Sequence, residues 1–157
     1  MVITVLPGRP SVGDVIEIPT QDGPAYAQYS HWSDRYGESF RVLPGVHESR
    51  PADWDPLVGQ PELFSTFTPL AQAIHDHNVS VVASVPVPRS AESFPIMRAP
   101  GLADANGNNV WWLWDGKREW RIPELTAEQQ RLSIREIVGL AVIADRLLNG
   151  WTPPQEI

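Results

Sequence analysis

Cysteine is absent from the 157-residue sequence, which excludes disulfide bonds, thiolate metal ligands and a cysteine nucleophile. Long apolar runs are also missing, since no stretch approaches the ~18 residues that a membrane-spanning helix needs. Residues 1–6 are mostly apolar, but Pro7 and Gly8 follow at once, so this stretch is too short for the hydrophobic core of a signal peptide. We therefore expect a soluble protein that is not exported.

Motifs of common catalytic and cofactor sites are absent as well. The sequence contains no GxxxxGK[ST] or GxGxxG phosphate loop and no GxSxG hydrolase motif. His75 and His77 stand two residues apart in a predicted helix and point about 200° apart, so they cannot share a metal ion there. Residues 104–108 begin like a calcium loop, but the required glycine at its sixth position is Asn109. We expect no catalytic residue, no cofactor and no metal site.

Basic residues are few: 12 Lys and Arg stand against 19 Asp and Glu, which gives a net charge of −7 at pH 7. This balance argues against direct binding of nucleic acid. The excess lies in the first half, where ten acids and four bases precede Val79, whereas nine acids and eight bases follow from there on. Such a surface would attract a basic partner and speed its encounter, although an acidic surface that only keeps the protein soluble is an equal alternative.

The length and the 42% of hydrophobic residues predict a single domain over residues 1–157 with a core of its own. Sixteen prolines and eleven glycines are spread along the chain and mark turns between short elements, not a linker. The predicted fold is α+β and mainly β, with an antiparallel twisted sheet on which one longer C-terminal helix and one short helix pack.

Alternating apolar residues predict short strands joined by tight turns. The expected strands are one closed by Pro19 after residues 15–18, then 25–32, 40–43, a central strand over 79–85, and an edge strand over 94–98. Asp22-Gly23 is expected to form the first turn. The clearest signal is a hairpin over 109–122, whose two β-prone runs flank Asp115-Gly116.

Four of the seven tryptophans lie in this hairpin. Alternation places Trp112 and Trp114 on one face, where we expect them with Trp120 to pack against the C-terminal helix, and leaves Trp111 on the other. The predicted core joins the hairpin to the central strand and the helix. It contains Trp112, Trp114, Val81, Val85 and Leu147.

Helices are indicated at two places. Pro69 opens a short helix over 70–78. Thr126 with Gln129, and Ser133 with Glu136, have the spacing of capping boxes, which predicts a brief helical turn and then a longer helix from about Ile134 to Asn149. Gly139 leaves room for a start nearer Leu140. The apolar stripe of the long helix is Ile137, Leu140, Ala141, Ala144, Leu147 and Leu148, and Gly150 is its cap.

The segment 47–62 contains three prolines and is predicted to be a long loop, a kind of element that often carries function. Aromatic residues surrounded by acids occur within it and just before it, a combination typical of protein-recognition surfaces. The candidate partner-binding residues are Tyr29, Trp32, Asp34, Tyr36, Glu38, Asp53, Trp54 and Asp55. The alternative is that the aromatic residues form a small hydrophobic cluster under the loop.

Several sequence blocks resemble the immunity protein 26 family of bacterial polymorphic toxin systems. They are GDVIEIPTQDGPAYAQYSHWSDRYGESFRVLPG at 13–45, FxxFTPLAQAI at 64–74, VPVPRSAESFPIMR at 85–98, WWLWDGKREWRI at 111–122, and LTxEQxxLSIRE followed by GWTP near the end. The resemblance covers nearly the whole chain. It implies a mainly β, cytoplasmic antidote that binds a toxin made by the same or neighbouring cells, with no cofactor and no catalytic residues to transfer.

The charge agrees with such a role, because toxin domains that cut nucleic acid are typically basic and an acidic inhibitor can occupy the phosphate site. Two other classes stay open. A small hydrolytic enzyme could pair carboxylates chosen from Asp53, Asp55, Glu62 and Glu119. A peptide- or carbohydrate-binding module would use exposed aromatic side chains.

Overall fold

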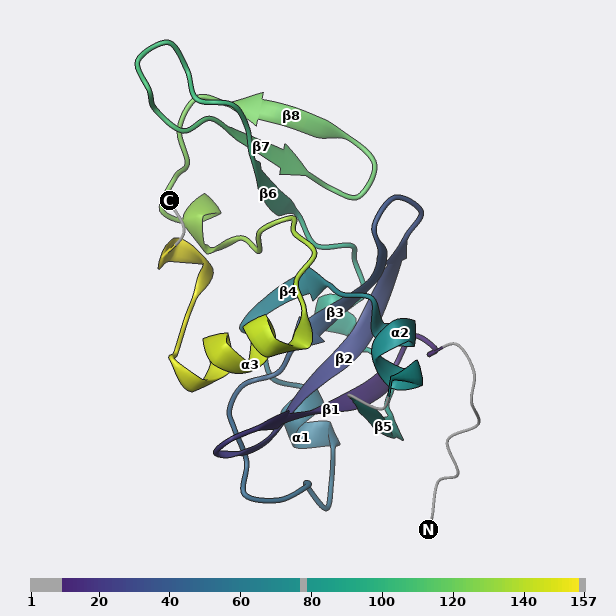
Figure 1. Ribbon diagram of the computed structural model, residues 1–157. Helices are drawn as coiled ribbons and strands as arrows, with labels where there is room; N and C mark the ends of the chain where they lie inside the picture. The colour runs from purple at the N-terminus through teal and green to yellow at the C-terminus, as the bar shows by residue number, and fades with distance from the viewer. Residues whose placement is uncertain (1–9, 77–78, 156–157) are drawn as a thin grey trace.

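The computed structural model describes residues 10–76 and 79–155, whose strands form two antiparallel sheets (Figure 1). The larger sheet has the order β4-β3-β2-β1-β5 and consists of β1 (Asp14–Thr20), β2 (Gly23–Ser33), β3 (Gly37–Val42), β4 (Phe64–Phe67) and β5 (Ser80–Ser84). The smaller sheet has the order β6-β7-β8 and consists of β6 (Met97–Pro100), β7 (Trp111–Trp114) and β8 (Glu119–Ile122). The predicted α+β, mainly β class is confirmed, with two sheets in place of one.

The described residues also form three α-helices and three 3-10 turns. They are α1 (Asp55–Val58), α2 (Leu70–His75), η1 (Arg89–Ala91), η2 (Gln129–Arg131), α3 (Leu140–Leu148) and η3 (Pro153–Gln155). The expected short helix over 70–78 corresponds to α2, and its last predicted positions, 77 and 78, lie outside the described residues. In the part of the chain that the structure describes, no helix is long and apolar enough to cross a membrane.

The hairpin of β1 and β2 turns at residues 21–22, one residue before the expected Asp22-Gly23 turn, and β1 runs past Pro19 to Thr20. Pro19 lies opposite Pro24, next to the closing pair of the two-residue turn. Residues of such a pair in an antiparallel ladder exchange no hydrogen bonds. The missing N–H groups of the two prolines therefore cost no hydrogen bond between β1 and β2 at this position. Gly23 has φ +128°, and a Cβ there would lie 2.0 Å from the carbonyl oxygen of His47.

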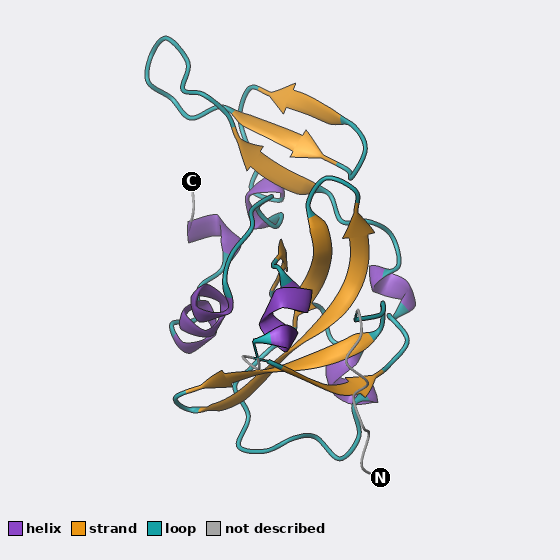
Figure 2. Ribbon diagram, turned by 45° about the vertical axis from the view of Figure 1, so that its right-hand side comes forward, coloured by secondary structure: helices purple, strands orange, loops and turns teal. Residues whose placement is uncertain are grey.

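Both faces of the larger sheet are covered, and Figure 2 shows how strongly this sheet twists. On one face, a core that includes Ile16, Ile18 and Phe40 packs with residues of α2 and α3. On the other face, α1 contributes Leu57 and Val58 to a second cluster. The two clusters are made by alternate residues of the same strands, which explains why β2 is buried without a break from Ala25 to Ser30.

Strand β5 is an edge strand, so the predicted central position for 79–85 is wrong. Its apolar residues are nevertheless covered on both faces: Val79 and Val81 belong to the α2–α3 side, and Val82 and Ala83 to the α1 side. Burial on two faces leaves the same sequence pattern as a central position. A register shift in the pairing with β1, between Val15 and Ile16, interrupts this edge, a feature that discourages edge-to-edge association.

The predicted hairpin over 109–122 is confirmed as β7 and β8. The carboxylate of Asp115 accepts hydrogen bonds from the backbone N–H groups of Lys117 and Arg118, at 2.9 and 2.7 Å. Gly116 has φ +97°, and a Cβ at this position would contact the ring of Phe94 at 2.8 Å. The expected edge strand near Pro95 is β6, which begins at Met97.

The tryptophans of this hairpin do not join the core of the larger sheet, which corrects the prediction of one common core. Trp114 packs with Phe67 and Met97, whereas Val81 and Leu147 belong to the core under α3 and Val85 to the α1 side. The physical reason is that residues 133–138, predicted to be helical, are extended and bond to both sheets, and Trp114 packs against Phe67 at the end of β4.

The other predicted tryptophan positions also change. Trp111, expected on the outer face, is buried beneath the guanidinium of Arg98, which lies 4.3 Å from its ring centroid. Arg98 is itself buried and donates from its side chain to the carbonyl oxygens of Leu132 and Pro153. Trp112 is half-buried and Trp120 is 38% exposed. Through the bonds of Arg98 to Leu132 and Pro153, the C-terminal segments cover the face of β7 that carries Trp111.

The long helix begins at Leu140, the alternative start that Gly139 allowed, and not at Ile134, because residues 133–138 are extended and bond to both sheets. Arg98 of β6 donates its N–H to Ser133 at 2.9 Å and accepts from Arg135 at 2.8 Å. Phe67 of β4 donates to Glu136 at 3.2 Å and accepts from Val138 at 2.9 Å. These bonds replace the helical hydrogen bonds that a start at residue 134 would make.

The second predicted capping box is therefore absent, while the first is formed. Thr126 and Gln129 exchange reciprocal side-chain to backbone hydrogen bonds of 2.9 and 3.1 Å. The hydroxyl of Ser133 instead accepts from the N–H of Ser65, at 2.8 Å. In the predicted apolar stripe Ile137 is 61% exposed, whereas Ile143, which the stripe omitted, is fully buried. Gly150, with φ +64°, follows the end of α3 as expected.

Replacing Trp114 with alanine should lower the free energy of unfolding by about 3–5 kcal/mol, because a large aromatic side chain is removed from a packed cluster. Urea denaturation measures the change. Trp120→Ala is the matched control in the same hairpin, since its side chain is partly exposed and should cost about 1 kcal/mol or less. Equal losses in the two variants would contradict the packing described for Trp114.

Candidate protein interface

The structure divides the candidate partner-binding residues into two groups. The hairpin-tip group comprises Tyr29, Trp32, Asp34, Tyr36 and Glu38, at the β2–β3 end of the larger sheet, and the α1 group comprises Asp53, Trp54 and Asp55. Trp54 packs against Tyr26, six residues before Trp32 on β2. At ~3.3 Å per residue the two groups are about 20 Å apart along the strand, so they do not form one continuous patch.

Within the hairpin-tip group, three side chains meet in a small pocket. Tyr29, Trp32 and Glu38, together with Pro10, line a cavity of about 270 Å³. Residues three apart on a regular strand point to opposite faces, but the pairing of β2 with β3 shifts register between Tyr29 and His31. This irregularity brings Tyr29 and Trp32 to one side, and Glu38 is the direct ladder partner of Trp32.

Trp32 is 47% exposed, and its indole N–H donates to the carboxylate of Asp34 at 3.1 Å. This bond holds the ring beside the hairpin turn. Tyr29 is only 5% exposed and forms the inner wall of the pocket. An exposed indole between two carboxylates offers a partner a large apolar contact surrounded by negative charge.

Tyr36 does not contribute to this pocket. Its ring packs against Phe67 and Trp114, with centroid distances of 5.2 and 5.3 Å. The guanidinium groups of Arg35 and Arg135 lie 5.2 and 5.5 Å from the same ring. Tyr36 therefore joins the tip of the β2–β3 hairpin to the smaller sheet, which is a structural role.

In the α1 group, Trp54 is half-buried and meets Tyr26 edge-on, with ring centroids 4.8 Å apart. It belongs to the cluster beneath the 47–62 loop, as the hydrophobic-cluster alternative predicted. Asp53 accepts a hydrogen bond from the N–H of Asp55 at 3.1 Å, and both acids are exposed. The group presents two carboxylates to solvent but little apolar surface.

A buried arginine holds this loop on the sheet. The guanidinium of Arg41 donates to the side chain of Gln28 at 2.8 Å and to the backbone carbonyls of Val58 and Gln60 at 3.1 and 2.8 Å. Its Nε lies 3.3 Å from the carboxylate of Glu62. Since a buried cation is tolerated only when it is paired and hydrogen-bonded, this network fixes the end of the loop and with it α1. Neither its partners nor its burial could be inferred from an isolated arginine in a strand.

The ion pairs of the described residues involve acids other than the candidate ones. Over residues 10–76 and 79–155 the ion pairs are Arg41–Glu62, Arg50–Glu17, Arg135–Glu119 and Arg146–Glu136. Two of the bases in the acidic half are thus engaged with other carboxylates. Asp34, Glu38, Asp53 and Asp55 take part in none of these pairs, so their charges add to a negative surface.

The described residues contain no group of three or more His, Asp or Glu side chains placed to hold a metal ion. His31 and His47 bond through Nε2 to backbone carbonyl oxygens, of Glu92 at 2.8 Å and Pro44 at 3.2 Å. His77, considered in the sequence, lies outside the described residues. No protein-family model, curated protein or solved structure matches this chain.

The phenol of Tyr26 should titrate late. Burial, followed by the charge of Glu17 and the 3.2 Å hydrogen bond to its carboxylate, raises the pKa of Tyr26 to about 12. Because the folded pKa exceeds the ordinary value near 10, the stabilising contribution is complete below pH 10 and is lost between about pH 10 and 12. Tyrosinate absorbance in a pH titration should lose a late step in Tyr26→Phe. A variant whose late absorbance change equals that of the parent protein would contradict the assignment.

Proposed function

We propose that this protein is an immunity protein: it binds a bacterial polymorphic toxin in the cytoplasm and blocks the toxin's active surface without catalysis. The observation that carries this proposal is the hairpin-tip pocket, where half-exposed Trp32 stands between Asp34 and Glu38. The resemblance of the sequence blocks to the immunity protein 26 family supports the same role.

The charge distribution supports a basic toxin. A toxin domain that cleaves nucleic acid needs a positive surface for the phosphates, and a protein of net charge −7 with exposed carboxylates competes for that surface. The carboxylates attract the toxin over several ångströms and speed encounter. Trp32 then supplies the apolar anchor, and inhibition follows because substrate can no longer reach the covered site.

The two groups of acids make it possible to distinguish a toxin bound at the hairpin-tip pocket from one bound at the α1 group. A toxin seated on the hairpin-tip pocket contacts Asp34 and Glu38, whereas Asp53 and Asp55 lie about 20 Å away along the strand. Steering acts at a range near the ~10 Å Debye length, so both pairs can affect the association rate. Only the pair inside the contact should also change the dissociation rate.

Charge reversal of Asp34, Glu38, Asp53 and Asp55 to lysine should slow association with the cognate toxin about tenfold or more and weaken its salt dependence, since the steering charges are inverted. Stopped-flow binding at two ionic strengths measures this, with the protein encoded by the adjacent open reading frame as the candidate toxin. Glu124→Lys with Glu128→Lys, on the less acidic half, is the control. Unchanged association of the quadruple variant would move the interface away from these acids.

Trp32→Ala should weaken the complex about 30-fold, equivalent to about 2 kcal/mol, mainly through faster dissociation, as expected for a central aromatic anchor. Trp120→Ala, which also removes a partly exposed indole, should leave the affinity unchanged. Isothermal titration calorimetry with the same toxin domain measures both. Equal effects of the two substitutions would argue against the hairpin-tip pocket.

A further inference from the structure

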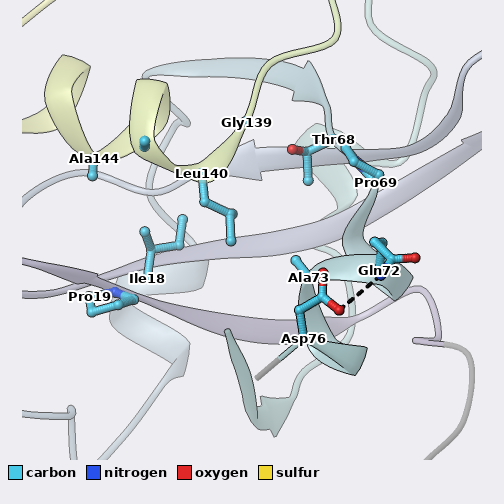
Figure 3. A pocket seen from close by; sticks show the side chains of 11 residues that line it. Ile18, Pro19, Thr68, Pro69, Gln72, Ala73, Asp76, Gly139, Leu140 and Ala144 are labelled. Carbon is cyan, nitrogen blue, oxygen red and sulfur yellow. Dashed lines mark hydrogen bonds between the residues drawn. The ribbon is translucent and has the colours of Figure 1, made fainter. Parts of the chain in front are cut away.

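A second hollow lies on the face of the larger sheet that also carries the hairpin-tip pocket, between α2, α3 and the end of β1 (Figure 3). Its volume is about 500 Å³, within the ~300–1,000 Å³ range of pockets that hold ligands. We call it the α2–α3 groove. It is lined by Ile18, Pro19, Thr68, Pro69, Gln72, Ala73, Asp76, Gly139, Leu140, Ala141 and Ala144.

The groove exists because α2 and α3 line it mainly with small side chains. Ala73 comes from α2, and Ala141 and Ala144 come from α3, while Ile18 and Leu140 supply larger apolar side chains from the strand and the helix start (Figure 3). These alanines cannot bridge the space between the helices. Most of the lining side chains are apolar, and the hollow stays open at the surface.

The helices are also held in place, so the groove is preformed. Fully buried Ile143 fastens α3 to the sheet core. The hydroxyl of Thr68, just before α2, donates to the carbonyl oxygen of Val138, just before α3. Leu70, the first residue of α2, is fully buried in the same core as Ile143. A preformed cavity spares a partner the cost of ordering these elements.

Charge and position indicate what the groove accepts. Among the described residues that line it, Asp76 is the one that carries a charge, and its carboxylate accepts a 2.9 Å hydrogen bond from Gln72. Thr68, at one end of the groove, donates its N–H to the backbone oxygen of Glu38 at 3.4 Å. One end of the groove therefore lies next to the β2–β3 pair that carries the hairpin-tip pocket. The groove and the pocket both present negative charge.

We propose that the α2–α3 groove receives an apolar side chain of the toxin, next to a lysine or arginine that pairs with Asp76. This proposal rests on the proposed function, because the same basic partner occupies the hairpin-tip pocket. Two apolar contacts then hold the toxin on this acidic face. Trp32 packs against the toxin, and an apolar side chain of the toxin enters the groove. The α1 group lies on the opposite face and makes no direct contact in this arrangement.

The test fills the groove without disturbing the core. Ala141 is exposed on the groove wall, so Ala141→Phe should occupy the hollow, whereas its neighbour Val142, 41% exposed, does not line the groove and Val142→Phe serves as the matched control. In isothermal titration calorimetry with the same candidate toxin, we expect Ala141→Phe to weaken binding about tenfold or more. Val142→Phe should bind like the parent protein, and Asp76→Asn should lose affinity mainly at low salt.

The outcomes separate the two proposals. If the parent protein does not bind this toxin domain, the proposed function falls, and the groove proposal with it. If Trp32→Ala weakens the complex but Ala141→Phe binds normally, only the groove proposal is overturned. If Ala141→Phe converts a dimer of the protein to a monomer in sedimentation velocity, the groove belongs to a second copy of this chain and the proposal is overturned as well. Circular dichroism melts of both phenylalanine variants confirm that they fold.

Discussion

The two sheets are joined by the backbone of one extended segment, residues 133–138. Its first half bonds to β6 through Arg98 and its second half bonds to β4 through Phe67, so a single run of chain lies against the outer strand of each sheet. The hydroxyl of Ser133 adds a bond to Ser65. Buried N–H and C=O groups on these strands need partners, and this segment supplies them. The cluster of Phe67, Met97 and Trp114 packs at the same junction.

Local signals in the sequence predicted the elements that local chemistry determines. The Asp115-Gly116 hairpin and the Thr126–Gln129 capping box each need only residues within four positions, and both are present, while the first hairpin turn lies one residue before the predicted Asp22-Gly23. Ser133 and Glu136 have the same capping spacing, yet they form no cap because bonds to strands far away in sequence compete for the same backbone. The identical pattern thus gives two structures, and the tertiary partner decides which one forms.

The candidate surface was predictable in composition but not in geometry. Aromatic and acidic residues in 29–55 were visible in the sequence, whereas the register shift that turns Tyr29 and Trp32 to one side depends on strand pairing. Tyr36 belongs to the same sequence cluster but is drawn to the smaller sheet by Phe67 and Trp114. The α2–α3 groove left no signal, because the alanines that create it look like ordinary helix formers. Hollows of this kind arise from the distance between elements, which no local pattern encodes.

The position of the joining segment also shapes how the chain reaches its native state. Strands β1 to β4 are complete by Phe67, and β6 by Pro100, but their outer edges gain backbone partners only from residues 133–138. During synthesis from the N-terminus, both edges therefore emerge from the ribosome well before the segment that covers them. Uncovered edges pair readily with other chains, and such long-range closure slows folding. The nascent protein thus passes through an interval in which a chaperone or a second nascent chain competes with its own C-terminal part for β4 and β6.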